Sequence, residues 1–218
     1  REDLEGCAHR RMAVMKPLKL IIDNYPEGQS EELVAENHPQ KPEMGSRSIT
    51  FSRELWIEET DFAEVPPKGF RRLTVPADGS PAKPVRLRYG YVIVPTSFEK
   101  DAEGRVTVVH ANYLPETKSG TEGSMSVKTK ATIHWLDAQT ARAAEFRVYD
   151  RLFNEPNPEA GEGTFLDHLT PNSKTILQGY VEPCTADAAN EERFQFERTG
   201  YFLSLIHISE PTRPEPIS

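Results

Sequence analysis

The sequence is poor in cysteine and has no long apolar run. Cys7 and Cys184 are the only cysteines among 218 residues, and no C-x-x-C pair or group of histidines at ligand spacing occurs. This composition favours a reduced compartment and predicts no zinc site. No apolar run approaches the roughly 20 residues that span a bilayer, and the charged start REDLEGCAHRR does not resemble a secretion signal. We therefore expect a cytoplasmic protein without a membrane partner.

The common catalytic motifs are also absent. The sequence contains no G-x-S-x-G, H-E-x-x-H, G-x-x-x-x-G-K-[ST] or G-x-G-x-x-G. Its six histidines are scattered, which is typical of packing and surface residues rather than of a catalytic group. We therefore expect no catalytic residue, no metal site and no cofactor in this chain.

Basic residues are scarce overall but concentrated locally. Lysine and arginine total 26 against 34 acidic residues, a formal net charge of -8. Residues 23–64 hold eleven acidic and three basic residues, whereas residues 67–94 hold six basic residues and only Asp78 as an acid. A local basic face attracts phosphate within a Debye length of about 8 Å at physiological salt. An acidic chain can therefore carry a nucleic-acid site, provided that the site is local.

Short alternating segments predict an all-β fold. So many short strands, separated by turn-rich segments and 18 prolines, favour a sandwich or barrel. A short helix is expected within residues 2–11, a weak helix within 136–146 and one helical turn within 164–173. The segments expected to be extended are 16–22, 48–57, 70–75, 85–94, 105–113, 131–136, 145–153, 174–182 and 193–202.

The segment VRLRYGYVIV, residues 85–94, combines strand alternation with two arginines. Read with a period of two, Arg86 and Arg88 share one face with Gly90, and Val85 and Leu87 lie on the other. An ordinary solvated strand face explains this pattern equally well.

Several motifs together resemble one family. They are REDL-x5-R-x-MAV at 1–14, NHPQKPEMGSR at 37–47, F-S-x-E-L-W-I-E at 51–58, VRLRYGYVI at 85–93, IHW at 133–135, YDRLF at 149–153 and FQFERTGYF at 194–202. In this order they resemble the carboxy-terminal half of bacterial-type glutaminyl-tRNA synthetases.

The resemblance implies two β-barrels of a kind shared with a ribosomal RNA-binding protein, the distal barrel being inserted in the proximal one. Residues 1–11 would end a helical connecting region. Residues 12–65 and 154–202 would form the proximal barrel, and residues 66–153 the distal barrel. We expect residues 203–218 to be a non-native or divergent tail, because they depart from the family pattern.

The resemblance also implies a function. The family's class I enzymes join glutamine to its tRNA with ATP and Mg²⁺, on a domain that carries H-I-G-H and M-S-K signatures. Neither signature is present; GSMSVK at 123–128 is interpreted as a coincidence within a polar loop. We therefore expect a monomeric anticodon-binding region that is inactive alone and binds glutamine-specific tRNA, not DNA.

The same resemblance suggests which residues contact the anticodon. Arg86 and Arg88 would handle the first base, Arg72 with Arg71 the third, and Arg10 with Gln195 the central uracil. Gln40 and Arg198 occupy further anticodon-side positions. Arginine's fork suits base edges and phosphates, and a glutamine amide both donates and accepts.

Plainer interpretations remain for each of these residues. Any of the arginines could be a solvated surface charge, and Gln195 would point outward between Phe194 and Phe196 with or without RNA. Arg198 falls on the phenylalanine face unless the strand ends or bulges near Glu197. A stand-alone RNA-binding barrel protein, or the matching region of an archaeal or eukaryotic glutamyl-tRNA synthetase, are the alternative functions.

Overall fold

The computed structural model describes residues 2–155, 157 and 164–205, and within them the chain is built almost entirely of strands. The expectation of an all-β fold is confirmed: the single α-helix of the described part, α1, spans only Glu2–Glu5. Among these residues no helix is long and apolar enough to cross a bilayer.

The strands are short and form four sheets. Their orders are β10-β7-β8-β9-β3-β6-β11, β12-β13-β2, β1-β14-β15 and β4-β5. The strands are β1 His9–Arg11, β2 Ala13–Val14, β3 Pro17–Ile22, β4 Ser30–Glu36, β5 Ser46–Ser52, β6 Glu54–Glu58, β7 Val85–Leu87, β8 Val92–Lys100, β9 Val106–Leu114, β10 Thr132–Ile133, β11 Leu136–Asp137, β12 Arg142–Tyr149, β13 Lys174–Val181, β14 Arg193–Phe196 and β15 Gly200–Leu203. Short 3-10 helices are η1 Pro42–Met44, η2 Glu59–Asp61, η3 Pro115–Thr117, η4 Glu122–Met125, η5 Phe165–His168 and η6 Pro183–Thr185.

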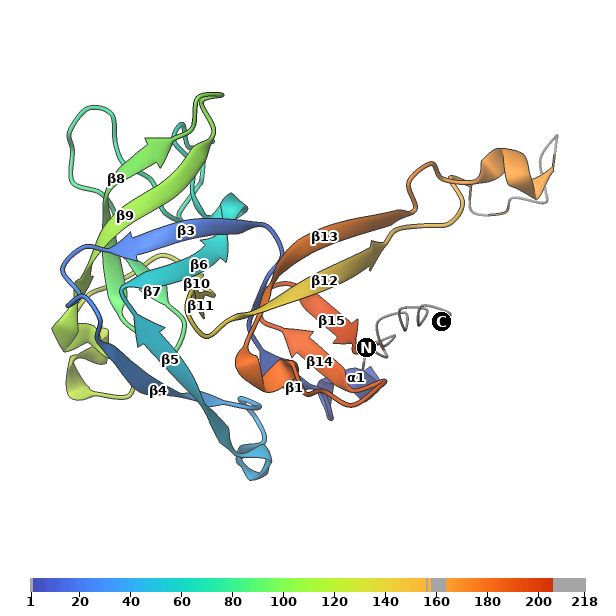
Figure 1. Cartoon of the computed structure of the whole chain (residues 1–218), viewed down its shortest axis with the longest axis horizontal. Coiled ribbons are helices and arrows are strands. Elements are labelled where there is room, and N and C mark those ends of the chain that lie inside the picture. Colours follow the sequence, from blue (N-terminus) through green and yellow to red (C-terminus); the bar gives the residue numbers. More distant parts are fainter. Residues whose placement is uncertain (1, 156, 158–163, 206–218) are drawn as a thin grey trace, which may run out of the picture.

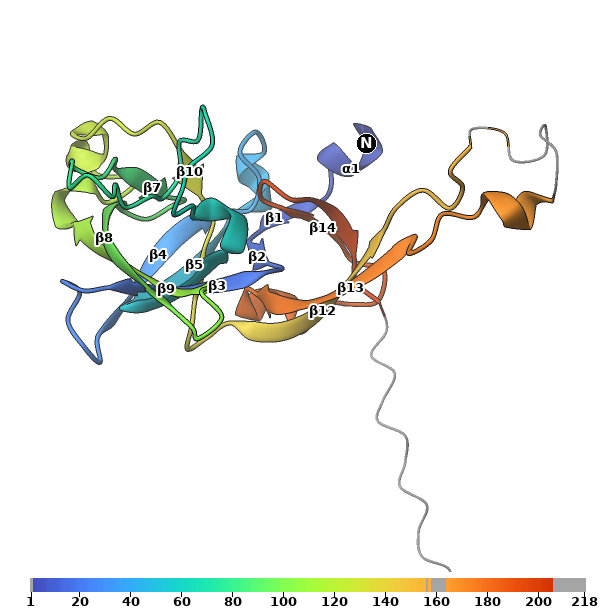
Figure 2. The same cartoon turned by 90° about the horizontal axis from the view of Figure 1, so that it is seen from above.

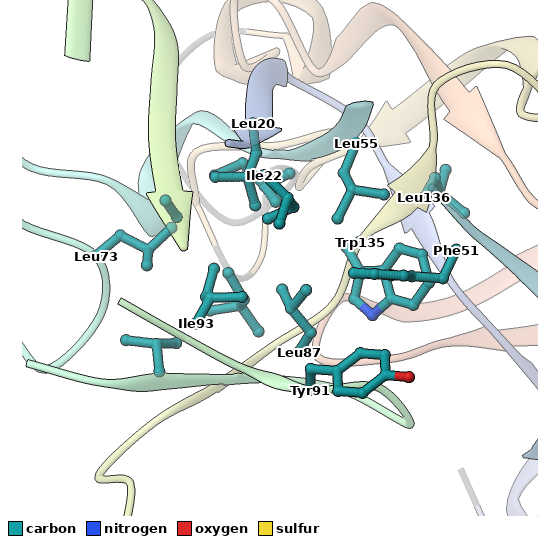
Figure 3. Close-up of a cluster of buried hydrophobic side chains, with 14 of the residues drawn as sticks. Leu20, Ile22, Phe51, Leu55, Leu73, Leu87, Tyr91, Ile93, Trp135 and Leu136 are labelled. Carbon is teal, nitrogen blue, oxygen red and sulfur yellow. The ribbon is translucent and has the colours of Figure 1, made fainter. Parts of the chain in front are cut away.

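The seven-stranded sheet curves around the larger of two hydrophobic cores. Alternation creates its inner face: in β3, Leu18, Leu20 and Ile22 are buried while Lys19 and Ile21 are only partly covered. Aliphatic side chains of the other strands meet them, and the Phe51 ring packs edge-on against Trp135 (Figure 3). We call this part the large body.

A smaller body is built on a separate core. Phe146 of β12, Val181 of β13 and the two phenylalanines of β14 bury one another between the sheets β12-β13-β2 and β1-β14-β15. Its β12 and β13 run away from the rest of the molecule as a two-stranded arm (Figures 1 and 2).

The two bodies group the chain differently from the two expected barrels. β3 and β6, from residues 12–65, lie in the same sheet and core as β7, β8 and β9, from residues 66–153. β12, expected in the distal barrel, pairs along its length with β13 in the small body. The expected boundary at residues 65 and 66 thus runs through one continuous core, because β3 pairs with both β6 and β9.

Residues 85–94 form a hairpin instead of the single strand expected from their alternation. β7 ends at Leu87, and the chain turns through Tyr89, whose φ is 60°, so that Val85 pairs with Ile93. Arg88 lies in the turn. The expected single strand is therefore wrong beyond Arg88. The alternation holds at its start, because the backbone N–H groups of Arg86 and Arg88 donate in turn to Ala131 and Ile133, and both arginines are partly covered while Val85 and Leu87 are buried.

Three other local expectations fail because tertiary pairing overrides weak propensity. Residues 2–11 are helical only to Glu5, and β1 then pairs with β14. The alanine-rich segment 136–146 extends into β12 instead of forming a helix. Residues 70–75 form no strand but one isolated bridge, between Leu73 and Phe62. The expected helical turn within 164–173 is confirmed by η5.

A buried ion pair joins the two bodies. The Arg47 guanidinium on β5 donates to both carboxylate oxygens of Glu182, which follows β13, with Nε–Oε2 and Nη2–Oε1 distances of 2.5 and 2.6 Å. The backbone N–H of Met12 also donates to Glu182 Oε1. Both charged side chains are almost fully buried. A buried carboxylate needs such partners, so this group ties the bodies where the chain first passes between them.

Replacement of Trp135 tests the large core. The ring is buried and its Nε1 donates to Arg88 O at 2.8 Å, so Trp135→Ala removes both packing and a turn contact. We expect the free energy of unfolding to fall by about 3–5 kcal/mol in urea titrations. Val65→Ala, at an exposed position, is the control; equal effects of the two changes would contradict this core.

His110 on β9 contacts two carboxylates, one on β8 and one directly after β3. Its Nδ1 lies 2.9 Å from Asp23 Oδ1, beyond β3, and its Nε2 lies 3.1 Å from Glu99 Oε1 on β8. Both nitrogens must donate to satisfy two carboxylates, which requires the protonated ring. The hydrogen bond to Asp23, with support from Glu99, accordingly raises the pKa of His110 above its ordinary value.

A raised pKa makes this contact pH-dependent. Its stabilisation is complete below the unfolded value of about 6.5 and is lost as pH rises through the folded pKa. We expect the difference in melting temperature between the unmodified chain and His110→Gln to shrink over this window. A difference that stays constant from acid to alkaline pH would show that the ring does not titrate there.

Candidate nucleic-acid interface

A row of polar and planar side chains crosses the sheet β1-β14-β15. Arg10 is the register partner of Gln195, and Gln195 is the partner of Tyr201 on β15. Phe194, Phe196 and Phe202 fill the small core on the opposite face, so alternation directs this row outward. The outward direction expected for Gln195 is thus confirmed.

Two members of the row have unused hydrogen-bonding atoms. Arg10 Nε and Gln195 Oε1 are covered, yet neither has a hydrogen-bond partner among the described residues. Glu5 forms a long ion pair with Arg10, 3.8 Å from its Nη2. Covered polar atoms are normally paired. A donor and an acceptor on adjacent strands are therefore left unpaired beneath the surface of this row.

A second group lies around Glu197, directly after β14. The Tyr89 hydroxyl donates to Glu197 Oε1 at 2.7 Å, and Arg88 Nε lies 3.2 Å from Oε2 as an ion pair. The Arg88 guanidinium also stacks over the Tyr89 ring at 5.1 Å. Burial and the Glu197 carboxylate raise the pKa of Tyr89, which keeps its hydroxyl protonated as a donor. The hairpin turn is thus attached to the small body.

A third group is centred on Asp61, at the end of η2. This fully buried carboxylate accepts from Arg72 Nη1 at 3.1 Å and from both terminal nitrogens of Arg198 at 2.9 and 2.7 Å. His134 Nδ1 lies 3.3 Å from Arg198 Nη1. Arg198 reaches this position because β14 ends at Phe196 and its own φ is 64°, which confirms the expected strand end near Glu197.

The Arg86 side chain forms its hydrogen bonds within the protein. Its guanidinium donates to the carbonyl oxygen of Thr117 at 3.1 Å, to Ser119 Oγ at 3.3 Å and to the carbonyl oxygen of Ser124. These acceptors belong to the segment of η3 and η4, so Arg86 holds that segment against β7.

Arg71 and Gln40 are solvent-exposed. Neither side chain has a hydrogen bond or ion pair within the described structure, although the Gln40 backbone N–H donates to His38 Nδ1 at 3.1 Å.

The structure thus places five of the eight predicted residues in these three groups. Arg10 and Gln195 share the row, while Arg88, Arg72 and Arg198 surround buried carboxylates. Sequence reasoning missed the residues that hold them: Asp61, Glu197, Tyr89, His134 and Tyr201. Only Glu197 and Tyr201 had a local signal, since they alternate with the phenylalanines of 194–202.

The arrangement suits recognition of a polar, planar ligand. Guanidinium forks, an amide and a phenol provide directional donors and acceptors on strands and tight turns. Across the described residues, no three histidine, cysteine, aspartate or glutamate side chains are placed to hold a metal ion.

Arg86→Ala separates a structural arginine from an exposed one. Loss of charge-assisted hydrogen bonds to the η3–η4 segment should lower the free energy of unfolding by about 2 kcal/mol. Amide hydrogen exchange at residues 117–124 should also become faster. Arg71→Ala is the matched control and should leave both measurements unchanged; similar behaviour of the two variants would refute the structural role of Arg86.

Two parts of the chain match a family of known proteins. Residues 8–114 and residues 132–204 each match a family described as "tRNA synthetases class I (E and Q), anti-codon binding domain".

Curated relatives match along nearly the whole chain. The chain is 58% identical over 214 residues to a glutamine–tRNA ligase of Cupriavidus necator, covering 98% of this chain and 36% of the relative. Glutamine–tRNA ligases of Ralstonia pickettii and Nitrosomonas europaea are 51% and 46% identical over 98% of the chain. The chain therefore spans about 36% of the length of these relatives.

Proposed function

The chain belongs to the family of anticodon-binding domains of class I tRNA synthetases for E and Q, and we propose that it binds the anticodon of glutamine-specific tRNA. In this proposal the whole protein is a glutamine–tRNA ligase of translation, acting in the cytoplasm as a monomer. The identities of the curated relatives support glutamine over glutamate.

The observation that carries the proposal is the unpaired donor Arg10 Nε beside the unpaired acceptor Gln195 Oε1 on adjacent strands; both atoms are covered, so the side chains would turn outward to meet a ligand. The edge of an unpaired pyrimidine offers carbonyl acceptors next to an imino donor, which complements one donor and one acceptor on adjacent strands. Specific RNA recognition uses such splayed, unpaired bases. Tyr201 continues the same row and provides a ring on which a neighbouring base can stack.

The arginines around the buried acids extend this surface. Arg88 and Arg72 each keep about a third of their side-chain surface exposed while one end is held by a carboxylate. Fixed guanidinium groups lose little freedom on binding, which favours directional contacts to bases and phosphates. Glu197 and Asp61 neutralise part of the positive charge of these arginines. RNA binding by this surface therefore depends more on the positions of the guanidinium groups than on their total charge.

Ligation itself is assigned to the remainder of the polypeptide. The described residues contain no metal cluster, and the sequence contains no phosphate-binding glycine loop. ATP and Mg²⁺ would therefore be held by the part of the protein that corresponds to the other portion of its relatives' length. This chain would contribute selection of the tRNA.

Binding titrations with RNA test the proposal. An anticodon stem-loop of glutamine-specific tRNA is compared with the same stem-loop carrying a changed central base. The unmodified chain should bind the changed RNA more weakly by about 1–3 kcal/mol, the cost of one misread base. Gln195→Ala should remove most of that difference, because it removes the unpaired acceptor.

Lys83→Ala is the control for a general loss of positive charge, since Lys83 is exposed in the loop before β7. It should weaken both RNAs slightly and equally, as expected of a cation that contacts only phosphate or solvent. Equal affinity of the unmodified chain for both stem-loops would reject anticodon recognition by this surface.

A further inference from the structure

The Arg198 guanidinium is bound to other side chains of the protein. Its terminal nitrogens form a bidentate pair with the two Asp61 oxygens, and Nη1 also faces His134 Nδ1. The end-on fork is the edge with which arginine reads a guanine or a phosphate. In this structure a carboxylate already occupies that edge.

Arg72 has the opposite arrangement. Only its Nη1 reaches Asp61, and its guanidinium stacks over the Phe70 ring at 5.1 Å. Its Nε and Nη2 have no hydrogen-bond partner within the described residues, and 35% of the side chain is exposed. Arg72 is therefore held by Asp61 and Phe70, while two of its nitrogens keep unused donors on a partly exposed side chain.

Asp61 connects these two arginines across the two bodies. Asp61 is the last residue of η2 in the large body, whereas Arg198 lies between β14 and β15 in the small body. Asp61 is 0% exposed, and both guanidinium groups donate hydrogen bonds to its carboxylate. Without Arg198, Arg72 would be the single strong partner of the buried Asp61 carboxylate. We expect the Arg72 guanidinium then to move inward, toward Asp61.

We propose that Asp61 and Arg198 are positioning residues that set the orientation of Arg72, and that Arg72 is the member of this trio that contacts RNA. The inference rests on the proposed anticodon-binding function and assigns roles within that surface. It makes the contributions of the three residues to RNA selectivity interdependent.

A mutant cycle tests these roles. Four stem-loops are titrated, the native one and three with one anticodon base changed each. Arg72→Ala identifies the base at which selectivity falls, with an expected loss of about tenfold. Arg198→Ala and Asp61→Asn should reduce selectivity at that same base. When Arg198→Ala or Asp61→Asn is combined with Arg72→Ala, the double variant should differ in selectivity from Arg72→Ala alone by less than about twofold. The reason is that the effects of residues that act through one another are not additive.

Folding is controlled by circular dichroism and urea unfolding of every variant. Arg198→Lys keeps a cation beside Asp61 and should retain more of the selectivity than Arg198→Ala, which covers the case in which the alanine variant folds poorly. Lys83→Ala removes a charge elsewhere and should leave selectivity unchanged.

Two results would overturn the assignment. One is a loss of selectivity at a different base in Arg198→Ala. The other is a further loss of about tenfold when Arg198→Ala is added to Arg72→Ala, as expected of independent contacts. Failure of the underlying function has another signature: the unmodified chain would bind all four stem-loops equally.

Discussion

The contact on which the arrangement depends is the buried pair between Arg47 and Glu182. It joins β5 of the large body to the end of β13 in the small body, and it also fixes the backbone at Met12. Two charges are removed from water here, which is tolerated only with close and complete pairing. The same guanidinium lies 5.8 Å from the Tyr89 ring, so the joint continues directly into the polar surface.

That continuity explains how an acidic chain can carry an arginine-based surface. Two of its arginines are matched with a buried acid supplied by another part of the chain: Arg88 with Glu197 and Arg72 with Asp61. The acids restrain the guanidinium groups and offset their charge. The relative position of the two bodies therefore sets where these guanidinium groups lie.

Much of the fold follows from local patterns. Clean alternation at 16–22 correctly predicted β3, because Leu18, Leu20 and Ile22 cover the large core with one face. The segments expected to be extended at 105–113 and 174–182 also form strands, β9 and β13. Alternation failed at 85–94, where a residue with positive φ folds the segment back on itself. The strand β4, Ser30–Glu36, was missed because most of its residues are polar or charged and its role is to pair with β5.

The sequence by itself determined the strand-rich class, the basic segment and the family, since these depend on residue types and their order. Tertiary structure decided what each arginine does. Arg86 and Arg88 are two positions apart, yet one holds a loop and the other lies in a turn against Glu197. Arg198 meets Asp61 across 137 positions of sequence. Such contacts arise only when separate strands pack, and no local periodicity records them.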